Sequence, residues 1–240
     1  KPQLSDQYAI GYFRNFKNRN YSLEVEAYYK TVANRIDYID GSDLIGQNNI
    51  ETQILNGESL SYGLELLFKK SVGDFTGWIA YTISKSSQRT PGGTAGGPGI
   101  NNGDWYNTYW DRPHDLSIVG SYQLNDKWSF GTAFIFQTGR PVTYPNGQYV
   151  YEELSVANFS ERNANRLPSY NRLDISATYV PNKKPENRWK GEWVFGIYNV
   201  YNRKNAAAIS FGQNRETGAN EATRTAIFGI VPSITYNFKF

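Results

Sequence analysis

The sequence predicts an all-β protein, an antiparallel transmembrane β-barrel meander of about nine strands. Three observations predict this fold. Apolar and polar residues alternate along segments that recur through the chain, the connections between segments are alternately short and long, and aromatic residues gather beside the short connections. Because successive side chains of a strand point to opposite faces, the alternation gives each strand one apolar and one polar face. Strands of a membrane barrel need one face for lipid and one for a polar lumen.

Nine segments show this alternation. In the third segment, Leu64 and Leu66 occupy one face of the strand and Glu65 occupies the other. No segment has helical periodicity over a useful length, and Gly, Pro and Asn punctuate the gaps. The predicted strands are 5–16, 21–39, 55–69, 75–86, 112–123, 128–139, 170–180, 189–211 and 226–240.

The same alternation predicts which side chains face lipid. A Lys or Arg on the lipid side of a barrel lowers its stability by about 2–4 kcal/mol at mid-membrane depth. The positions of charged residues along each strand therefore define the inner face. Residues expected to face outward are Tyr62, Leu64, Leu66, Phe68, Trp128, Phe130, Phe134, Tyr236 and Phe238. Residues expected to face inward include Glu24, Glu26, Glu65, Lys69, Asp174 and Lys239.

The connections predict one plain end and one elaborated end. Short turns are expected at 17–20, 70–74, 124–127 and 181–188, and long loops at 40–54, 87–111, 140–169 and 212–225. Outer-membrane barrels combine tight periplasmic turns with longer extracellular loops. We therefore expect an integral protein of the bacterial outer membrane, with lipid around it.

Aromatic residues predict where the membrane interface lies. The outward residue nearest each short turn is aromatic on both sides, and aromatic residues make up 16% of the chain. A soluble Greek-key domain, the alternative fold for this sequence, would favour Leu and β-branched residues at these positions. The expected girdle contains Phe16, Tyr21, Phe68, Phe75, Tyr122, Trp128, Tyr179, Trp189 and Phe240.

The last predicted strand ends on an aromatic residue. Tyr236, Phe238 and Phe240 occupy every second place. Bacterial outer-membrane barrels characteristically end on such a strand, and these three residues are similar to the signal that the barrel insertion machinery reads. We expect them to serve as a C-terminal assembly signal.

Composition excludes several classes of protein. The formal net charge of +3 is too small and scattered for a nucleic-acid footprint, and Cys is absent. No stretch approaches the ~18 apolar residues of a membrane helix. The mean hydropathy of −0.61 fits a barrel, since half of each spanning strand faces a polar lumen. Met is also absent, so residue 1 is not a translation start, which leaves room for a signal peptide or upstream domain.

An odd number of strands predicts that this chain is part of a longer barrel. Counting back from the last strand, strands 5–16 and 226–240 run in the same direction. Their direct pairing would be parallel, whereas bacterial barrels are antiparallel throughout. We therefore expect the two strands not to close a ring, and further strands to lie between them.

Several short runs are spread across all 240 residues. They are Gly11-Tyr12-Phe13-Arg14-Asn15-Phe16, Tyr28-Tyr29-Lys30, Tyr62-Gly63-Leu64-Glu65, Asp111-Arg112-Pro113-His114-Asp115, Gln137-Thr138-Gly139, Tyr201-Asn202-Arg203-Lys204-Asn205 and 228–240.

These runs, in this order, resemble the C-terminal barrel half of Bacteroidota TonB-dependent receptors, in the subgroup with a carboxypeptidase-like regulatory domain. The resemblance implies a 22-stranded barrel, a plug domain, energy relayed by TonB and uptake of scarce nutrients. Neither plug nor TonB box is present, so residues 1–240 would be the C-terminal portion of one barrel domain.

Charged residues of the inner face predict a wall that hydrates the lumen and forms salt bridges with a plug. Glu24 and Glu26 would lie about 7 Å apart at ~3.4 Å per residue, which is also the spacing of an inverting glycosidase pair. The mixed charges around them favour the wall, and a single histidine, His114, argues against a His-based triad. We therefore predict no enzyme, cofactor or metal site. The wall comprises Glu24, Glu26, Lys30, Glu65, Lys69, Arg172, Asp174 and Glu192, with Lys190 and Lys239.

Aromatic residues in two long loops are candidate ligand contacts. Rings at a loop tip can stack on a sugar or an apolar ligand, or pack against neighbouring loops or a surface lipoprotein. Both interpretations stay open from the sequence. The candidates are Trp105, Tyr106, Tyr109, Trp110, Tyr144 and Tyr149.

Two functions remain for the whole protein. The first is a receptor and transporter barrel for uptake of a scarce nutrient. The alternative is a structural or docking subunit of a larger outer-membrane assembly without active transport. An intact plug and TonB box upstream would favour the first.

Overall fold

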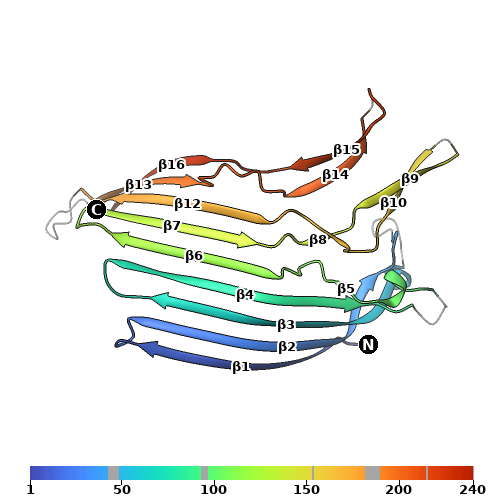
Figure 1. Ribbon diagram of the computed structural model, residues 1–240, viewed down its shortest axis with the longest axis horizontal. Helices are drawn as coiled ribbons and strands as arrows, with labels where there is room; N and C mark the ends of the chain where they lie inside the picture. Colours follow the sequence, from blue (N-terminus) through green and yellow to red (C-terminus); the bar gives the residue numbers. More distant parts are fainter. Residues whose placement is uncertain (43–48, 93–96, 153, 182–189, 215, 240) are drawn as a thin grey trace.

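One antiparallel sheet runs through the computed structural model, which describes residues 1–42, 49–92, 97–152, 154–181, 190–214 and 216–239 (Figure 1). Nine strands follow one another across the sheet in the order β1-β2-β3-β4-β6-β7-β12-β13-β16. They are β1 (Leu4–Phe16), β2 (Tyr21–Tyr38), β3 (Ile54–Lys70), β4 (Phe75–Arg89), β6 (His114–Gln123), β7 (Trp128–Gln137), β12 (Tyr170–Tyr179), β13 (Lys190–Tyr198) and β16 (Val231–Lys239). The meander of nine strands is confirmed.

One predicted strand is wrong in extent. The segment 189–211 was expected to be continuous, but β13 ends at Tyr198. Asn199 and Asn202 adopt left-handed φ angles of 54° and 50°, which turn the chain away from the sheet. The Asn199 side chain stabilises this turn, because Nδ2 donates to the Arg203 carbonyl (3.0 Å) and Oδ1 accepts from the Arg203 N–H (3.1 Å). For its part, β16 begins at Val231, not at residue 226.

The long connections carry small elements of their own. Two hairpins project from the loop end, β9 (Pro145–Tyr151) with β10 (Leu154–Phe159), and β14 (Ala208–Gln213) with β15 (Asn220–Thr225) (Figure 1). The short strands are β5 (Tyr106–Asn107), β8 (Pro141–Val142) and β11 (Asn165–Arg166), and the 3₁₀ turns are η1 (Ile50–Gln53) and η2 (Asn101–Gly103). The molecule therefore has the expected plain and elaborated ends.

The strand register separates the side chains into two faces. Paired residues share a face, and Phe68 pairs with Ile79, Ile79 with Ile118 and Ile118 with Phe134. The same pairing connects Trp128, Tyr179, Trp193 and Tyr236. All nine residues expected to face outward lie on this apolar face, and all six expected to face inward lie on the other.

The apolar face covers no protein core. Leu64, Phe130 and Ile234 are 44%, 41% and 69% exposed. Among the described residues, the buried apolar side chains are Ile100, Tyr106 and Leu167, and all three belong to loops. A soluble Greek-key domain would bury its apolar face, so this alternative fold is excluded. The large apolar side chains face lipid. In the part of the chain that the structure describes, no helix has the length and apolar character to cross a membrane.

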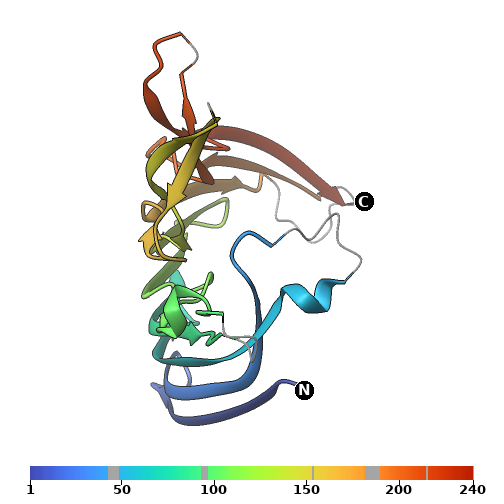
Figure 2. The ribbon, with the colours of Figure 1, turned by 90° about the vertical axis from the view of Figure 1, so that its right-hand side faces the viewer.

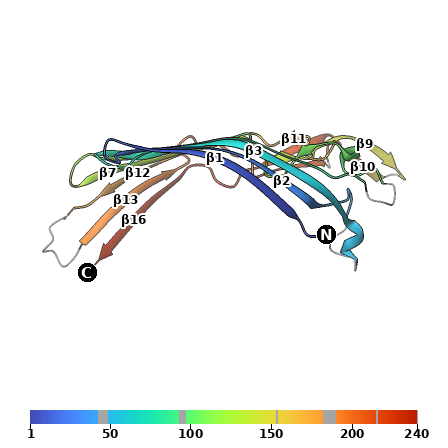
Figure 3. The same cartoon turned by 90° about the horizontal axis from the view of Figure 1, so that it is seen from below.

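The polar face is the concave one. Gln88 Nε2 donates to Asp37 Oδ2 (2.6 Å) and Arg35 Nε donates to Gln88 Oε1 (3.2 Å), so side chains of β2 and β4 meet across β3. Such side chains converge only on the inside of a curved sheet. The sheet is bent into a trough, and the diagonal corners that hold the two chain ends bend to the same side (Figures 2 and 3). Strands inclined to the axis of a cylinder have this geometry.

The two outermost strands do not meet. Among the described residues β1 and β16 form opposite edges of the sheet and do not pair with each other, as expected for strands that run in the same direction. Rings near the short turns contact one another on the lipid side. Centroids lie 5.9 Å apart for Tyr21 and Phe68 and 4.7 Å apart for Trp128 and Tyr179. Two girdle positions, Trp189 and Phe240, lie outside the described residues.

Two leucines of β3 that lie on opposite faces test the assignment of those faces. Leu64 pairs with Ala27 and Ile83 on the lipid face, whereas Leu67 pairs with Glu24 on the concave face. We expect Leu64→Arg to lower the free energy of unfolding by about 2–4 kcal/mol, because it places a charge in hydrocarbon. The matched control Leu67→Arg should have a much smaller effect, since it gains Glu24 as a neighbour. Urea unfolding in micelles measures both, and equal losses would contradict the assignment.

Candidate functional site at the loop end

A β-bulge in β2 turns two charged residues toward the concave side. Asn34 has a left-handed φ of 57°, and the register with β3 shifts between Ala33 and Arg35. An extra residue reverses the face on which the following side chains lie. Arg35 and Asp37 therefore point inward at the mouth of the trough, where their side chains reach Gln88 of β4 across β3.

Asp37 forms a buried cluster with the loop between β4 and β6. The Tyr106 hydroxyl donates to Asp37 Oδ2 (2.7 Å), accepts from Gln88 Nε2 (3.0 Å) and lies 2.9 Å from Thr90 Oγ1. Tyr106 is 6% exposed. Burial, followed by the hydrogen bond to the Asp37 carboxylate, raises the pKa of Tyr106 to about 12. The Tyr106 ring and hydroxyl therefore pack against neighbouring parts of the chain. Packing was the alternative to ligand contact for the loop aromatics.

Arg162 ties the loop between β7 and β12 to the end of β2. Its Nη1 donates to Asp37 Oδ1 (3.0 Å) and to the Tyr38 carbonyl (2.8 Å), and its Nε donates to Asp40 Oδ1 (3.0 Å). Three strands, β3, β4 and β6, lie between β2 and β7 in the sheet. The loop therefore crosses the concave side at the mouth.

A fully buried carboxylate, that of Asp111, holds the start of β6. Asp111 is 1% exposed, and its Oδ1 accepts from the Ser86 N–H (2.5 Å) while its Oδ2 accepts from Arg166. His114 Nδ1 lies 2.8 Å from the Tyr81 hydroxyl. The run from Asp111 to Asp115 therefore has a structural role at the entry to β6.

The other aromatic candidates lie at the surface of the loops. Trp105, Tyr109, Trp110 and Tyr149 are 46%, 55%, 53% and 55% exposed. Guanidinium groups lie over three of these rings, with the carbon of Arg35 4.5 Å from the Trp110 centroid, that of Arg140 4.5 Å from Tyr109 and that of Arg89 5.3 Å from Trp105. Contact between these residues and a ligand stays a prediction.

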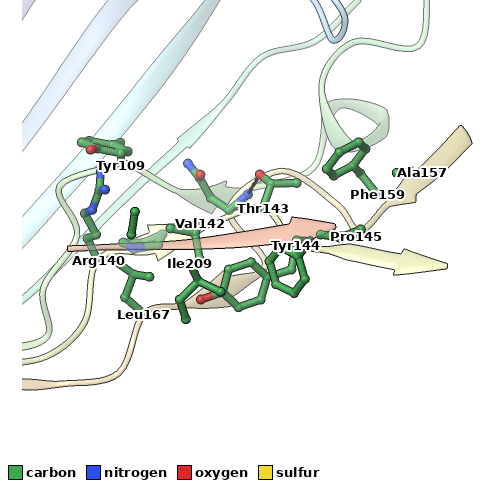
Figure 4. A pocket seen from close by; sticks show the side chains of 14 residues that line it. Tyr109, Arg140, Val142, Thr143, Tyr144, Pro145, Ala157, Phe159, Leu167 and Ile209 are labelled. Carbon is green, nitrogen blue, oxygen red and sulfur yellow. Dashed lines mark hydrogen bonds between the residues drawn. The ribbon is translucent and has the colours of Figure 1, made fainter. Parts of the chain in front are cut away.

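A cavity of about 510 Å³ is lined by residues of three long connections, those that follow β4, β7 and β13 (Figure 4). Tyr109 and Arg140 lie at one side of it, and the Tyr144 ring packs against Phe211 with centroids 4.9 Å apart. The Tyr144 hydroxyl oxygen is inaccessible to solvent and has no hydrogen-bond partner among the described residues. Burial raises the pKa of Tyr144. The lining is Tyr109, Arg140, Pro141, Val142, Thr143, Tyr144, Pro145, Ala157, Phe159, Asn163, Leu167, Ala208, Ile209 and Phe211.

The predicted inner wall has two different parts. Near the loop end, Arg172 Nε donates to Asp174 Oδ2 (2.9 Å) and its Nη1 donates to the hydroxyls of Tyr170 and Tyr198 (3.0 Å each). At the opposite side of the sheet, Glu26 pairs directly with Glu65, and Glu24 lies two residues away. No ion pair among the described residues includes these three carboxylates. Lys30, Lys69 and Glu192 share the same concave face, and no described group of His, Asp or Glu has the arrangement of a metal site.

Sequence analysis missed several residues that build the mouth. Asp37, Gln88, Asp111, Arg162 and Arg166 were absent from the candidate residues, because each acts through a partner far away in the chain. The available signal for Asp37 was an Asn residue followed by a break in the alternation. Nothing local distinguished Arg162 from any other loop Arg.

The Arg162 contacts can be tested by substitution. Arg162→Gln should raise amide hydrogen-exchange rates in residues 156–163 by about tenfold or more, because charge-assisted hydrogen bonds contribute about 1.5–3 kcal/mol. Arg89→Gln is the control, since the Arg89 and Glu58 side chains are 45% and 44% exposed and such pairs contribute little. Unchanged exchange in Arg162→Gln would show that the loop is held by other contacts.

The raised pKa of Tyr106 predicts a loss of stability at high pH. Its folded pKa of about 12 lies above the ordinary value of 10.0, so the folded state retains the proton longer. The contribution is complete below pH 10.0 and is lost as pH rises through 12. We expect the free energy of unfolding to fall by roughly 1–3 kcal/mol over this range in the wild type and less in Tyr106→Phe. Tyr149→Phe, which changes an exposed ring, should behave like the wild type.

Comparisons with solved structures show a shared fold. Residues 1–240 superpose on the ferric-catecholate import receptor Fiu of Escherichia coli with a TM-score of 0.59 and 14% identity, covering 100% of this chain and 28% of that one. The ferripyoverdine receptor of Pseudomonas aeruginosa gives 0.60 and 13%, covering 99% and 27%. The outer-membrane transporter YddB of Escherichia coli gives 0.56 and 13%, covering 99% and 32%. The chain thus spans about a third or less of each structure.

Sequence comparison identifies the family. No curated protein sequence matches the chain. The model of the family described as "TonB dependent receptor-like, beta-barrel" matches residues 1–200, which is most of the chain. The fold, the lipid-facing apolar surface and the concave polar wall agree with this match, and they place the protein in the bacterial outer membrane. The chain belongs to the TonB-dependent receptor-like β-barrel family.

Proposed function

We propose that this chain is the C-terminal portion of a TonB-dependent receptor that takes up a scarce nutrient across the outer membrane. The observation that carries the proposal is the cavity at the loop end, which combines an apolar aromatic lining with an unpaired hydroxyl. Such cavities bind small molecules, because the apolar lining supplies affinity and the few polar groups fix orientation.

The cavity chemistry suggests the kind of group that it would hold. The buried Tyr144 hydroxyl has no partner among the described residues, and an unmade buried hydrogen bond costs about 1–3 kcal/mol. The oxygen is inaccessible to solvent in the empty protein, so a ligand that presents a hydrogen-bond acceptor would remove this cost by displacing the side chains that cover the hydroxyl. The Arg140 guanidinium lines the same space and would favour an anionic ligand.

The inner wall supports a plug as the missing partner. Glu24, Glu26 and Glu65 carry like charges in adjacent places of β2 and β3 without an ion-pair partner among the described residues. Like charges directly opposite each other destabilise a sheet. Basic groups of a plug domain would neutralise them, and TonB would supply energy through that plug. The resemblance to Bacteroidota receptors with a regulatory domain and a 22-stranded barrel belongs to the same proposal.

The end of the chain supports assembly by the barrel insertion machinery. Tyr236 and Phe238 lie on the lipid face of β16, and their ring centroids are 6.1 Å apart. An exposed aromatic stripe on an edge strand is available to a receptor that reads it. Phe240, the third residue of this proposed signal, lies outside the described residues.

Uptake can be tested in cells that express the native protein. Mass spectrometry of a defined medium should show one class of solute depleted only when the protein is present and the proton gradient is intact. Tyr144→Phe should reduce that uptake about two- to tenfold at limiting solute, because it removes one hydrogen bond. It should not lower the stability of the empty protein, since the hydroxyl is unpaired there.

Tyr151→Phe is the matched control, because Tyr151 is 61% exposed on the β9 hairpin and lies outside the cavity lining. Its uptake should equal that of the wild type. Depletion that persists without a proton gradient would contradict energy-coupled transport. Equal uptake by Tyr144→Phe and wild type would contradict the assignment of the cavity.

One observation favours docking as a second candidate function. The tip of the β9 strand exposes three neighbouring apolar or aromatic side chains, with Tyr149, Val150 and Tyr151 55%, 75% and 61% exposed. Apolar side chains clustered on a projecting hairpin are typical of a contact with another protein, such as a surface lipoprotein. A protein that co-purifies with the receptor and is lost in Val150→Glu, with no energy-dependent solute depletion, would favour this function.

A further inference from the structure

Three cations gather on the lipid face beside the first short turn. Arg14 pairs with Leu23 on the outer side of β1, and Lys70 pairs with Tyr21 at the end of β3. Lys17 Nζ and Lys70 Nζ each lie 5.9 Å from the Tyr21 ring centroid, and the Arg14 guanidinium lies 4.9 Å from the Phe16 centroid. The three charges therefore surround one patch of the aromatic girdle.

The backbone fixes these charges in place. Lys17, Asn18 and Arg19 all have left-handed φ angles, of 46°, 55° and 70°. The Asn20 N–H donates to the Lys17 carbonyl (3.1 Å), and the Ser71 N–H donates to the Asn20 carbonyl (2.9 Å). The turn between β1 and β2 is thus joined to the end of β3, at the plain end of the sheet (Figure 1). Non-glycine residues in this backbone region are strained, and strain persists where the surroundings hold it.

Within the described protein, the partners of this patch include rings and carbonyl oxygens, since Lys70 Nζ donates to the carbonyls of Val72 (2.6 Å) and Phe75 (2.5 Å). None of the ion pairs among the described residues includes Arg14, Lys17 or Lys70. The turn 17–20 also contains Arg19 and no acidic residue, whereas the turn 124–127 contains both Asp126 and Lys127. The excess of positive charge is therefore local to β1, β2 and β3, and is not a property of the whole rim.

We propose that Arg14, Lys17 and Lys70 bind the headgroup of an anionic phospholipid in the periplasmic leaflet. Rings of an interfacial girdle lie at headgroup depth, so cations that contact these rings are within reach of lipid phosphates; Arg14, whose backbone lies on the hydrocarbon side of Phe16, reaches this depth with its guanidinium. The acyl chains would lie on the apolar face next to Leu23 and Val25. Because none of the three cations forms an ion pair with a described carboxylate, the patch favours a net negative headgroup over a zwitterionic one, whose ammonium it would repel.

The number of cations sets the expected preference for an anionic lipid. Each Lys or Arg near an anionic membrane surface contributes about a fivefold increase in affinity. Removal of two of the three cations should therefore weaken the preference for an anionic lipid by about 20–30-fold. Arg14 also donates to the Tyr12 hydroxyl (3.4 Å), an exposed contact whose loss should affect folding little.

Lipid competition on the native, purified outer-membrane protein tests the proposal. Native mass spectrometry would count bound lipids in equimolar phosphatidylglycerol and phosphatidylethanolamine with matched acyl chains. The wild type should retain phosphatidylglycerol, and Arg14→Gln/Lys17→Gln should lose that preference. The charge-matched control Lys127→Gln/Arg224→Gln, with one change in another turn and one in β15, should keep it.

A charge-conserving variant separates charge from fold. Arg14→Lys/Lys17→Arg should bind phosphatidylglycerol like the wild type, whereas a purely structural role for these side chains predicts loss. Retention of the preference in Arg14→Gln/Lys17→Gln would overturn the proposal. Equal binding of phosphatidylethanolamine by the wild type, or displacement of the lipid by millimolar inorganic phosphate, would also overturn it.

Discussion

Hydrogen bonding between neighbouring strands is the constraint on which this structure depends. In hydrocarbon each unpaired backbone group costs several kcal/mol, so the spanning segments must form a continuous ladder. The register of that ladder then decides the chemistry of both faces. A slip of one residue between β2 and β3 would move Leu64 to the lumen and Glu65 into lipid. The alternating pattern therefore specifies the register as well as the strands.

The mouth is built where this regular ladder is interrupted. Without the bulge at Asn34, Asp37 would lie on the same face as Tyr29, out of reach of Tyr106 and Arg162. One extra residue thus brings a carboxylate inward, and the loops from β4 and β7 both bind to it. Because two loops share this single carboxylate, their positions over the concave side are linked. Most residues that line the cavity beside Tyr144 belong to the loop that Arg162 anchors.

Local pattern predicted the sheet but not the loops. Alternation along each strand is a local consequence of having two different faces, so nine strands and their facing could be predicted without a structure. The break at Asn199 could not, because it depends on a turn that Asn199 stabilises through Arg203. Tyr106 and Trp105 are neighbours with similar side chains, yet one is buried and the other is 46% exposed. Their difference arises from partners in β2 and β4, which periodicity does not specify.

Positive charges at the two ends of the sheet differ in whether carboxylates of the chain are among their partners. At the loop end, Arg162, Arg166 and Arg172 each pair with a carboxylate of the chain, whereas Arg35 and Arg140 lie over aromatic rings. Arg162 and Arg166 hold loops in place, while Arg172 and Asp174 both belong to β12. At the turn end, Arg14 and Lys17 lie over aromatic rings with no described carboxylate beside them. Anions of the membrane are available at that depth, so the chain need not supply its own.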